Sequence, residues 1–131
     1  MKVLTVLINN KKYAIDIEYV KGIEQNVKIS PMSCISKKWI GMTNIRDELI
    51  KIYNPFDLFN YNISEEQILK NKMVIIDSDQ LFGLIIDDAL SVFEVENEML
   101  KEMPDILNID FINKVIEIDN DLIPILDVKK I

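Results

Sequence analysis

Apolar and polar positions alternate with a period of two along most of this chain. Clear examples are "VLTVLI" (3–8) and "YAIDI" (13–17), which the polar segment "NNKK" (9–12) separates. Alternation rich in β-branched residues is typical of half-buried strands, and two such runs around a short polar turn predict a hairpin. We therefore expect a β-hairpin over residues 3–17.

Three more hairpins are predicted further along the chain. Each consists of two apolar runs around a short polar turn, and the turns are Arg46-Asp47, Asp79-Gln80 and residues 119–121. Residues 19–29 and 89–96 add two further extended segments, so the chain contains eight to ten short strands. Short strands with turns at regular spacing indicate an antiparallel barrel or sandwich, and the expected fold class is all-β.

Few helices are expected. Asn54 followed by Pro55 is a typical helix start, because Asn caps the first turn and Pro fits the first helical position. Ser64 stands three residues before Gln67, which is the spacing of a capping box. Another turn or two is predicted over residues 96–103. No linker or repeat interrupts the pattern, so residues 1–131 are predicted to form one domain.

Composition places the chain among globular proteins and argues against one class of partner. Of its 131 residues, 49% are hydrophobic, and the formal net charge is −7. An acidic protein without a basic, aromatic stretch is not expected to bind nucleic acid. The charge is uneven, since residues 1–65 carry +2 and residues 66–131 carry −9. This asymmetry indicates an acidic face, which is either simply solvated or a surface for a partner.

Several kinds of chemistry are excluded by residue type. The chain has no histidine and only one cysteine, Cys34, which leaves no His-based catalysis and no internal disulfide. Adjacent Asp87 and Asp88 would point to opposite faces of a strand, and the acidic residues at 119–121 fit a turn better than a Ca²⁺ loop. No apolar run approaches the roughly 20 residues of a membrane-spanning helix. We expect a cytoplasmic protein without catalytic activity, metal or cofactor.

The only arginine, Arg46, stands in a predicted hairpin turn among fourteen lysines. A guanidinium is a planar fork that can bind a carboxylate or carbonyl groups through two bonds, whereas an ammonium is a mobile point charge. The position therefore suggests recognition of a partner, with chance as the alternative.

The motifs around these turns resemble one known family. "YAIDIEYVKGI", followed about seventeen residues later by "WIGMTNIRDELIKIYN", is similar to the chemotaxis coupling proteins with a CheW-like domain. The resemblance continues through Gly83 and Asp87 of "FGLIIDDALSVFEV" and through Leu126 and Asp127 near the end. The first two motifs match the family at these residues: Tyr13, Ala14, Asp16, Val20, Ile23, Gly41, Asn44 and Arg46.

The resemblance implies a fold of two intertwined, five-stranded, SH3-like barrels that share a hydrophobic core. It implies a non-catalytic adaptor that couples the cytoplasmic tips of chemoreceptors to the regulatory domain of a CheA-type histidine kinase. Such a protein is associated with membrane receptor arrays only through its partners. A receptor helix would lay an apolar stripe into a groove between the barrels. The expected partner-binding residues are Val20, Gly22, Ile23, Gly41, Asn44, Arg46 and Val92.

Several positions depart from the family pattern. Gly22 replaces a glutamate expected on a partner surface, and Asp47 replaces the glycine of the hairpin. The other departures are Lys51, Asn54 and Asn113. Because of Gly22, one alternative is a divergent CheW-like module that serves another kinase pathway. A second alternative, from a different class, is a small barrel that binds a ligand or metal on its acidic face.

Overall fold

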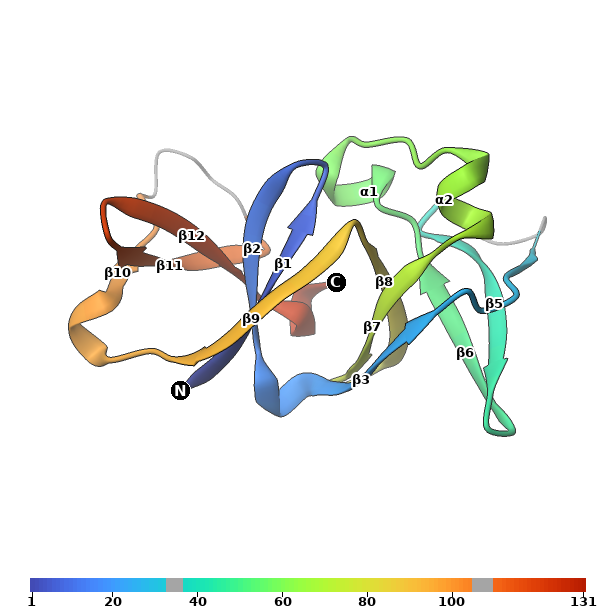
Figure 1. The fold of residues 1–131 in the computed structure, drawn as a ribbon, viewed down its shortest axis with the longest axis horizontal. Helices are drawn as coiled ribbons and strands as arrows, with labels where there is room; N and C mark the ends of the chain where they lie inside the picture. Colours follow the sequence, from blue (N-terminus) through green and yellow to red (C-terminus); the bar gives the residue numbers. More distant parts are fainter. Residues whose placement is uncertain (33–36, 105–109) are drawn as a thin grey trace.

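Two curled, six-stranded sheets lie side by side along the long axis of the molecule (Figure 1). The computed structural model describes residues 1–32, 37–104 and 110–131, without the side chains of Phe56 and Asn113. The first sheet has the order β10-β11-β12-β2-β1-β9 and the second β3-β7-β8-β6-β5-β4. We call the curled sheets the first barrel and the second barrel. The all-β prediction is confirmed, and the sixth strand of each sheet is a very short one, β10 or β4.

The first barrel combines both ends of the chain. Its strands are β1 (Lys2–Ile8), β2 (Lys11–Asp16), β9 (Asp88–Glu94), β10 (Leu100–Glu102), β11 (Ile112–Ile118) and β12 (Asp121–Leu126). Strands β2 and β12 pair in parallel at Ala14 and Ile125, which joins the N-terminal hairpin to the C-terminal hairpin. Short 3-10 turns, η1 (Ile17–Tyr19), η2 (Asn97–Met99) and η4 (Val128–Lys130), follow β2, β9 and β12.

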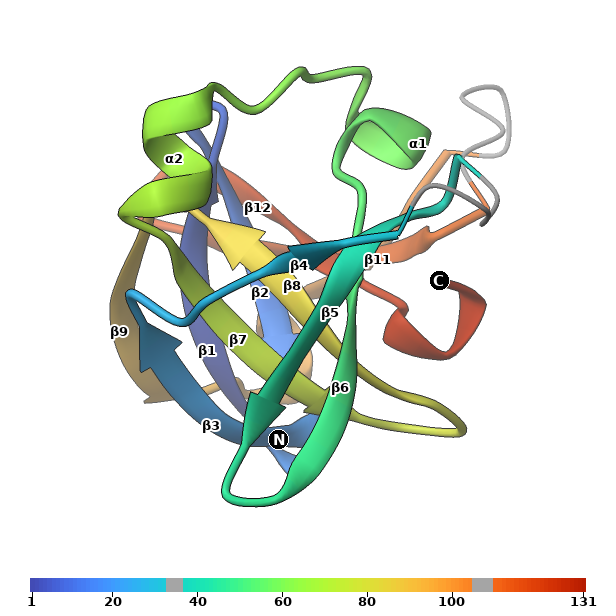
Figure 2. The same ribbon diagram turned by 90° about the vertical axis from the view of Figure 1, so that its right-hand side faces the viewer.

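The second barrel is formed by the middle of the chain. Its strands are β3 (Val20–Gln25), β4 (Ser30–Pro31), β5 (Trp39–Ile45), β6 (Glu48–Tyr53), β7 (Lys72–Asp77) and β8 (Leu81–Ile86). Helices α1 (Phe56–Phe59) and α2 (Glu65–Leu69) lie at the opposite end of this barrel from the β5–β6 turn (Figure 2).

Three of the predicted hairpins close through two-residue turns with left-handed backbone. The central residues have positive φ in the β1–β2 turn (Asn9 and Asn10), the β5–β6 turn (Arg46 and Asp47) and the β11–β12 turn (Asp119 and Asn120). Two consecutive residues with φ > 0 are the signature of the type I′ turn, whose twist matches that of the flanking strands. The segments "NNKK" and "DND" therefore contribute only their first two residues to the turns.

The two predicted helix starts differ in outcome: α1 begins at Phe56, two residues after Asn54, and α2 begins as expected. Ser64 and Gln67 form the predicted capping box at the start of α2. The segment 96–103 contains a single 3-10 turn and then enters β10, because Leu100–Glu102 pair with β11. Among the described residues no helix is long and apolar enough to cross a membrane.

The hydrophobic core has three parts, of which the largest lies between the barrels. This inter-barrel core includes Leu4 of β1, Val74 of β7 and, from the C-terminal turn, Val128 and Ile131. Trp39 is partly buried and packs against it edge-on to Tyr53 and Phe82, so the only tryptophan has a core role. Smaller clusters fill the interior of the first barrel around Ile116 and Ile123 and of the second around Ile52 and Met73. The two barrels thus share one buried interface.

Candidate partner-binding surface

Strand β3 is an edge strand of the second sheet and shows two different faces. It pairs with β7, and residues directly opposite one another on paired strands lie on the same face. Ile23 lies opposite Val74, and Val20 opposite Ile76; both partners belong to the inter-barrel core. Val20 and Ile23 therefore face the junction of the barrels. Ile23 remains 43% exposed there.

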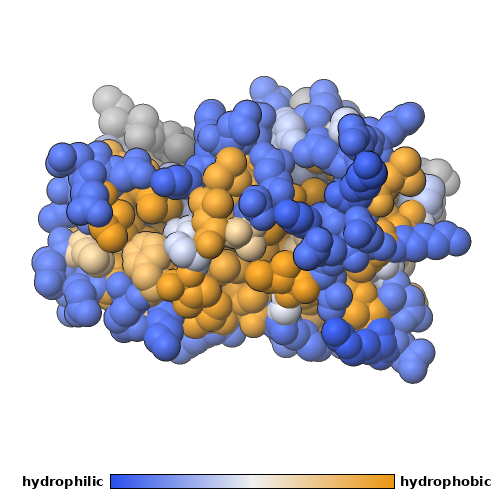
Figure 3. Space-filling model, viewed as in Figure 1, coloured by the Kyte–Doolittle hydropathy of each residue, from blue (hydrophilic) through white to orange (hydrophobic). Residues whose placement is uncertain are grey.

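Strand β9, an edge strand of the first sheet, contributes to the same junction. Its Val92 lies opposite Leu4 of β1, which belongs to the inter-barrel core, so Val92 faces that junction too. Val92 is 53% exposed. Figure 3 shows apolar side chains gathered over β9 at the centre of this face. Val20, Ile23 and Val92, predicted to line one groove, thus lie on edge strands that border a common core.

The other face of β3 lines the mouth of the second barrel. Gly22 and Glu24 lie opposite Ile75 and Met73, which belong to the interior cluster of that barrel. A Cβ added at Gly22 would meet no atom within 4 Å, so the position is open to a side chain. The structure therefore gives no steric reason for a glycine here.

Two ion pairs connect β3 to the β5–β6 hairpin across this mouth. Arg46 Nη1 lies 3.0 Å from Glu24 Oε1, and Lys21 Nζ lies 2.9 Å from Glu48 Oε1. The hydrogen bond to Glu48 raises the pKa of Lys21 above its usual value. A pocket of ≈ 100 Å³ remains between the two pairs, with Gly22 in its wall and Ile50 and Ile75 beneath.

The hairpin turn leaves Arg46 on the surface. Arg46 and Asp47 have φ values of 50° and 67°, and the Asn44 side-chain oxygen accepts a hydrogen bond of 3.0 Å from the Asp47 N–H. Asn44 therefore stabilises the turn. The Arg46 side chain is 82% exposed in spite of its contact with Glu24, which leaves most of the guanidinium donors accessible.

Gly41 differs from the other candidate residues because it is buried. A Cβ at this position would lie 2.4 Å from the Ser30 backbone oxygen, so only glycine permits the approach of β4 to β5. Gly41 supports the hairpin that carries Arg46 and does not itself present a side chain.

The two neighbouring aspartates, Asp87 and Asp88, do not converge on a common point. Asp87 accepts hydrogen bonds from the Asn10 N–H (3.2 Å) and the Gln67 side chain (3.2 Å), whereas Asp88 bonds Lys72 (3.1 Å). The two side chains therefore bind different partners, as predicted, but the reason differs: Asp87 lies in the bend between β8 and β9, and only Asp88 belongs to a strand. Within the described ranges no three His, Cys, Asp or Glu side chains gather as metal ligands. Cys34 lies outside the described residues.

A family model described as "CheW-like domain" matches residues 2–131. The chain belongs to the CheW-like domain family. Two relatives named "Chemotaxis protein CheW" are similar over nearly the whole chain. The one from Treponema pallidum (strain Nichols) is 25% identical over 137 residues, covering 99% of this chain and 81% of that protein. The one from Bacillus subtilis (strain 168) is 26% identical over 132 residues, covering 96% and 83%.

A solved structure supports the architecture of this CheW-like chain. The crystal structure of the scaffolding protein TtCheW from Thermoanaerobacter tengcongensis has a TM-score of 0.82 at 20% identity, and the match covers 95% of this chain and 87% of that one. At this level of identity the likeness shows the fold. It confirms the expected arrangement of two SH3-like barrels.

The departures from the CheW-like pattern have local physical accounts. The carboxylate missing at Gly22 is present two residues later, where Glu24 lies on the same face of β3 and contacts Arg46. Asp47 adopts the left-handed conformation that the family's glycine would favour. Lys51 places its ammonium 4.3 Å from the centre of the Trp39 ring and bonds Gln80. The side chain of Asn113 is outside the described part of the structure.

Sequence reasoning missed Glu24 as the partner of Arg46. The signal was present, because residues two apart on a strand share a face and a carboxylate at 24 can substitute for one at 22. The family motif has its glutamate at position 22, so the motif alone does not point to position 24.

Proposed function

We propose that this protein is a non-catalytic adaptor of chemotaxis signalling that joins the cytoplasmic tips of chemoreceptors to a CheA-type histidine kinase. Family membership and the relatives named CheW support the chemotaxis assignment. The observation that carries the proposal is that two edge strands, β3 and β9, expose the apolar side chains of Ile23 and Val92 beside one shared core. In this role the protein works in the cytoplasm, held at membrane receptor arrays by its partners, and uses no cofactor.

The receptor tip binds at the junction of the barrels. A chemoreceptor tip is a helical hairpin, and an amphipathic helix binds by placing its apolar stripe on an apolar groove. Val20, Ile23 and Val92 supply that apolar surface from two barrels. Complete burial of an exposed valine or isoleucine side chain contributes about 1.5–3 kcal/mol. Ile23 and Val92 are 43% and 53% exposed, so each supplies only part of that value toward the binding free energy.

The kinase regulatory domain binds at the mouth of the second barrel. The β5–β6 hairpin presents Arg46 there, in a turn that Asn44 stabilises and next to a strand that Gly41 allows to pack closely. A guanidinium with free donors binds a carboxylate or a row of carbonyl groups through paired bonds. Two surfaces, one apolar and one charged, allow both partners to bind at once.

Isothermal titration calorimetry tests each contact separately. The titrants are a receptor signalling tip and the kinase regulatory domain, and the variants are Val92→Ser, Arg46→Ala and the control Leu69→Ser. Leu69 on α2 is 76% exposed and lies on neither surface. We expect Val92→Ser to weaken only receptor binding, Arg46→Ala only kinase binding, and the control neither. Wild-type protein that binds neither partner would overturn the proposal and favour a CheW-like module of another pathway.

A further inference from the structure

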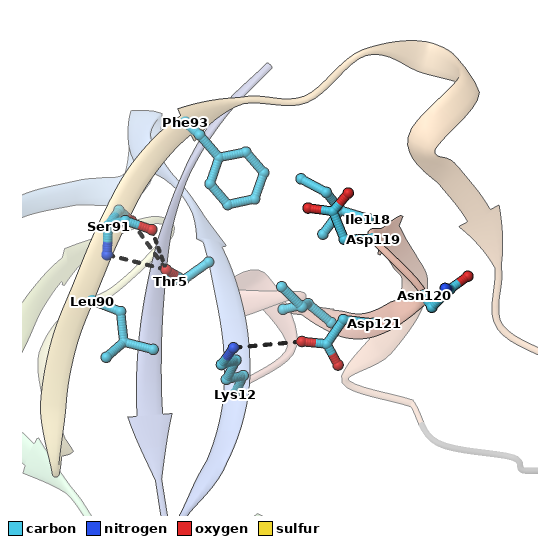
Figure 4. Close-up of a pocket in the computed structure, with 10 residues that line it drawn as sticks. Thr5, Lys12, Leu90, Ser91, Phe93, Ile118, Asp119, Asn120 and Asp121 are labelled. Atoms are coloured by element: carbon cyan, nitrogen blue, oxygen red, sulfur yellow. Dashed lines mark hydrogen bonds and ion pairs between the residues drawn. The ribbon is translucent and has the colours of Figure 1, made fainter.

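The mouth of the first barrel is far more open than that of the second. A groove of ≈ 560 Å³ lies there, whereas the ion-paired mouth of the second barrel holds ≈ 100 Å³. The groove of the first barrel has β1 and β2 at its base, β9 on one side and the β11–β12 hairpin on the other. In Figure 4, Phe93 of β9 and Ile118 of β11 project into the opening from opposite sides.

The groove uses the face of β9 that the adaptor surface leaves free. Ser91 and Phe93 alternate with Val92, so they point into the groove while Val92 points to the junction of the barrels. Leu90 stands at the irregularity where the pairing of β9 with β1 shifts register, and it is 42% exposed beside the groove. The same strand therefore carries two separate apolar surfaces.

The lining suits a segment of protein chain. Its walls combine apolar side chains, such as Leu90, Phe93 and Ile118, with the polar residues of the β11–β12 turn. Its polar base is internally satisfied, because Thr5 and Ser91 exchange hydrogen bonds of 3.1 Å. Among the described residues every buried side-chain polar atom has a hydrogen-bond partner. The described lining of the groove therefore offers no unpaired buried polar group that would orient a small polar ligand. An open groove with apolar side chains on both walls and carboxylates at its rim instead accepts a protein segment that carries both apolar and charged side chains.

The charge of the first barrel indicates what kind of chain binds. Residues 20–86, which include the second barrel, carry eight Lys/Arg and eight Asp/Glu, and are neutral. The remaining residues carry seven Lys/Arg and fourteen Asp/Glu. The whole net charge of −7 therefore belongs to the part of the chain that forms the first barrel. At the rim Lys12 is paired with Asp121 at 3.4 Å, while Asp119 makes no ion pair within the described ranges.

We infer that the mouth of the first barrel is a docking groove for a basic segment of a partner protein, whose apolar side chains contact Leu90, Phe93 and Ile118 and whose lysines or arginines contact Asp119 and Asp121. The basic segment competes with Lys12 for Asp121 and meets a free carboxylate at Asp119. This groove is separate from the surfaces of the adaptor function, so either assignment can fail without the other.

The test uses a seven-residue probe peptide of alternating Lys and Val, with a Glu/Val peptide as its counterpart. Amide chemical shifts of the full-length protein locate binding, and titration gives Kd. We expect the Lys/Val peptide to change the amide chemical shifts of Leu90, Phe93 and residues 118–121. Its affinity should fall as the salt concentration rises. The Glu/Val peptide should not bind.

The decisive variant is Asp119→Asn/Asp121→Asn, because asparagine keeps the left-handed preference needed at position 119 while removing charge. Its matched control, Glu98→Gln/Glu102→Gln, removes the same charge from exposed positions of the same barrel outside the groove. We expect Kd to rise at least tenfold in the first variant and less than twofold in the control. A second variant, Leu90→Ser, should raise Kd about fivefold. Equal effects of the two charge variants, or shifts outside the groove, would show attraction to net charge alone and overturn the inference.

Discussion

Arg46 and Glu24 bind each other across the mouth of the second barrel, with 3.0 Å between Nη1 and Oε1. The two residues come from different elements, a hairpin turn and an edge strand. The contact gives the only arginine an intramolecular partner and still leaves it largely exposed. Exposed ion pairs contribute about 0–1 kcal/mol to stability, so the pair orients the guanidinium more than it holds the fold.

Comparison of Arg46→Ala with Glu24→Gln separates orientation from direct contact. The free energy of unfolding of Arg46→Ala should lie within about 0.5 kcal/mol of wild type, as for most exposed substitutions. Glu24→Gln keeps the size of a side chain that is 22% exposed, so its unfolding free energy should change by no more than about 1 kcal/mol, the value of the ion pair. If Arg46 touches the kinase domain, Arg46→Ala should weaken binding by about 1–3 kcal/mol, the value of a charged hydrogen bond, and Glu24→Gln by clearly less. Titration calorimetry measures the affinities and thermal melts the stabilities. Equal losses from the two variants would leave Arg46 with a structural role only.

Two of the three glycines, Gly41 and Gly22, offer a matched pair for testing local packing. At Gly41 an added Cβ lies 2.4 Å from the Ser30 backbone oxygen, whereas at Gly22 it meets nothing within 4 Å. We expect Gly41→Ala to destabilise by about 1–3 kcal/mol, as overpacked sites do, and Gly22→Ala to be neutral or stabilising by about 0.5–1 kcal/mol. Urea unfolding gives both values. A neutral Gly41→Ala would mean that β4 does not approach β5 as described.

Restoring the family's glutamate at position 22 should be tolerated, for the same steric reason. Gly22→Glu places a second carboxylate on the face of β3 that carries Glu24, within reach of the Arg46 and Lys21 side chains. We expect normal folding, and we expect Gly22→Glu to rescue kinase binding in a Glu24→Gln background. Circular dichroism and titration calorimetry check the two expectations; an unfolded Gly22→Glu protein would contradict the open wall at this position.

The Asp47 backbone makes a prediction about the turn. Asp47 has a φ of 67°, a left-handed conformation in which a Cβ is unfavourable and a β-branched side chain more so. Asp47→Gly should be neutral or stabilising, and Asp47→Val should be less stable than Asp47→Gly by about 1–2 kcal/mol. Thermal melts of the two variants measure the difference. Identical melting temperatures would argue against a left-handed residue here.

The contact between Lys72 and Asp88 links β7 of one barrel to β9 of the other. The hydrogen bond from Lys72 lowers the pKa of Asp88 below its usual value. A lowered folded-state pKa stabilises the protein above the unfolded pKa, and the contribution disappears as pH falls through the folded one. Lys72→Gln should return the pKa of Asp88 toward its usual value in a carboxyl NMR titration, while Lys70→Gln should leave it unchanged.

Local features of this fold were predictable because their causes are local. Alternation located the hairpins, and the Ser64–Gln67 spacing located the start of α2. The parallel pairing of β2 with β12 was not predictable, since Ala14 and Ile125 are brought together by tertiary packing and no local pattern records it. The same reason hid the groove of the first barrel, whose lining runs from Thr5 to Ile123. The roles of single residues also depend on tertiary packing: Gly41 and Asn44, predicted as partner contacts, shape the hairpin, and the contact of Glu24 with Arg46 joins two separate elements.

The central claim is that one molecule holds both partners at once, and a bridging pull-down tests it most directly. Immobilised receptor signalling tip is incubated with the kinase regulatory domain, with and without this protein. The account predicts that the kinase domain is retained only when the protein is present, and that Val92→Ser or Arg46→Ala reduces retention while Leu69→Ser does not. Kinase retention that does not depend on the protein, or protein bound to the tip without retaining the kinase domain, would contradict it.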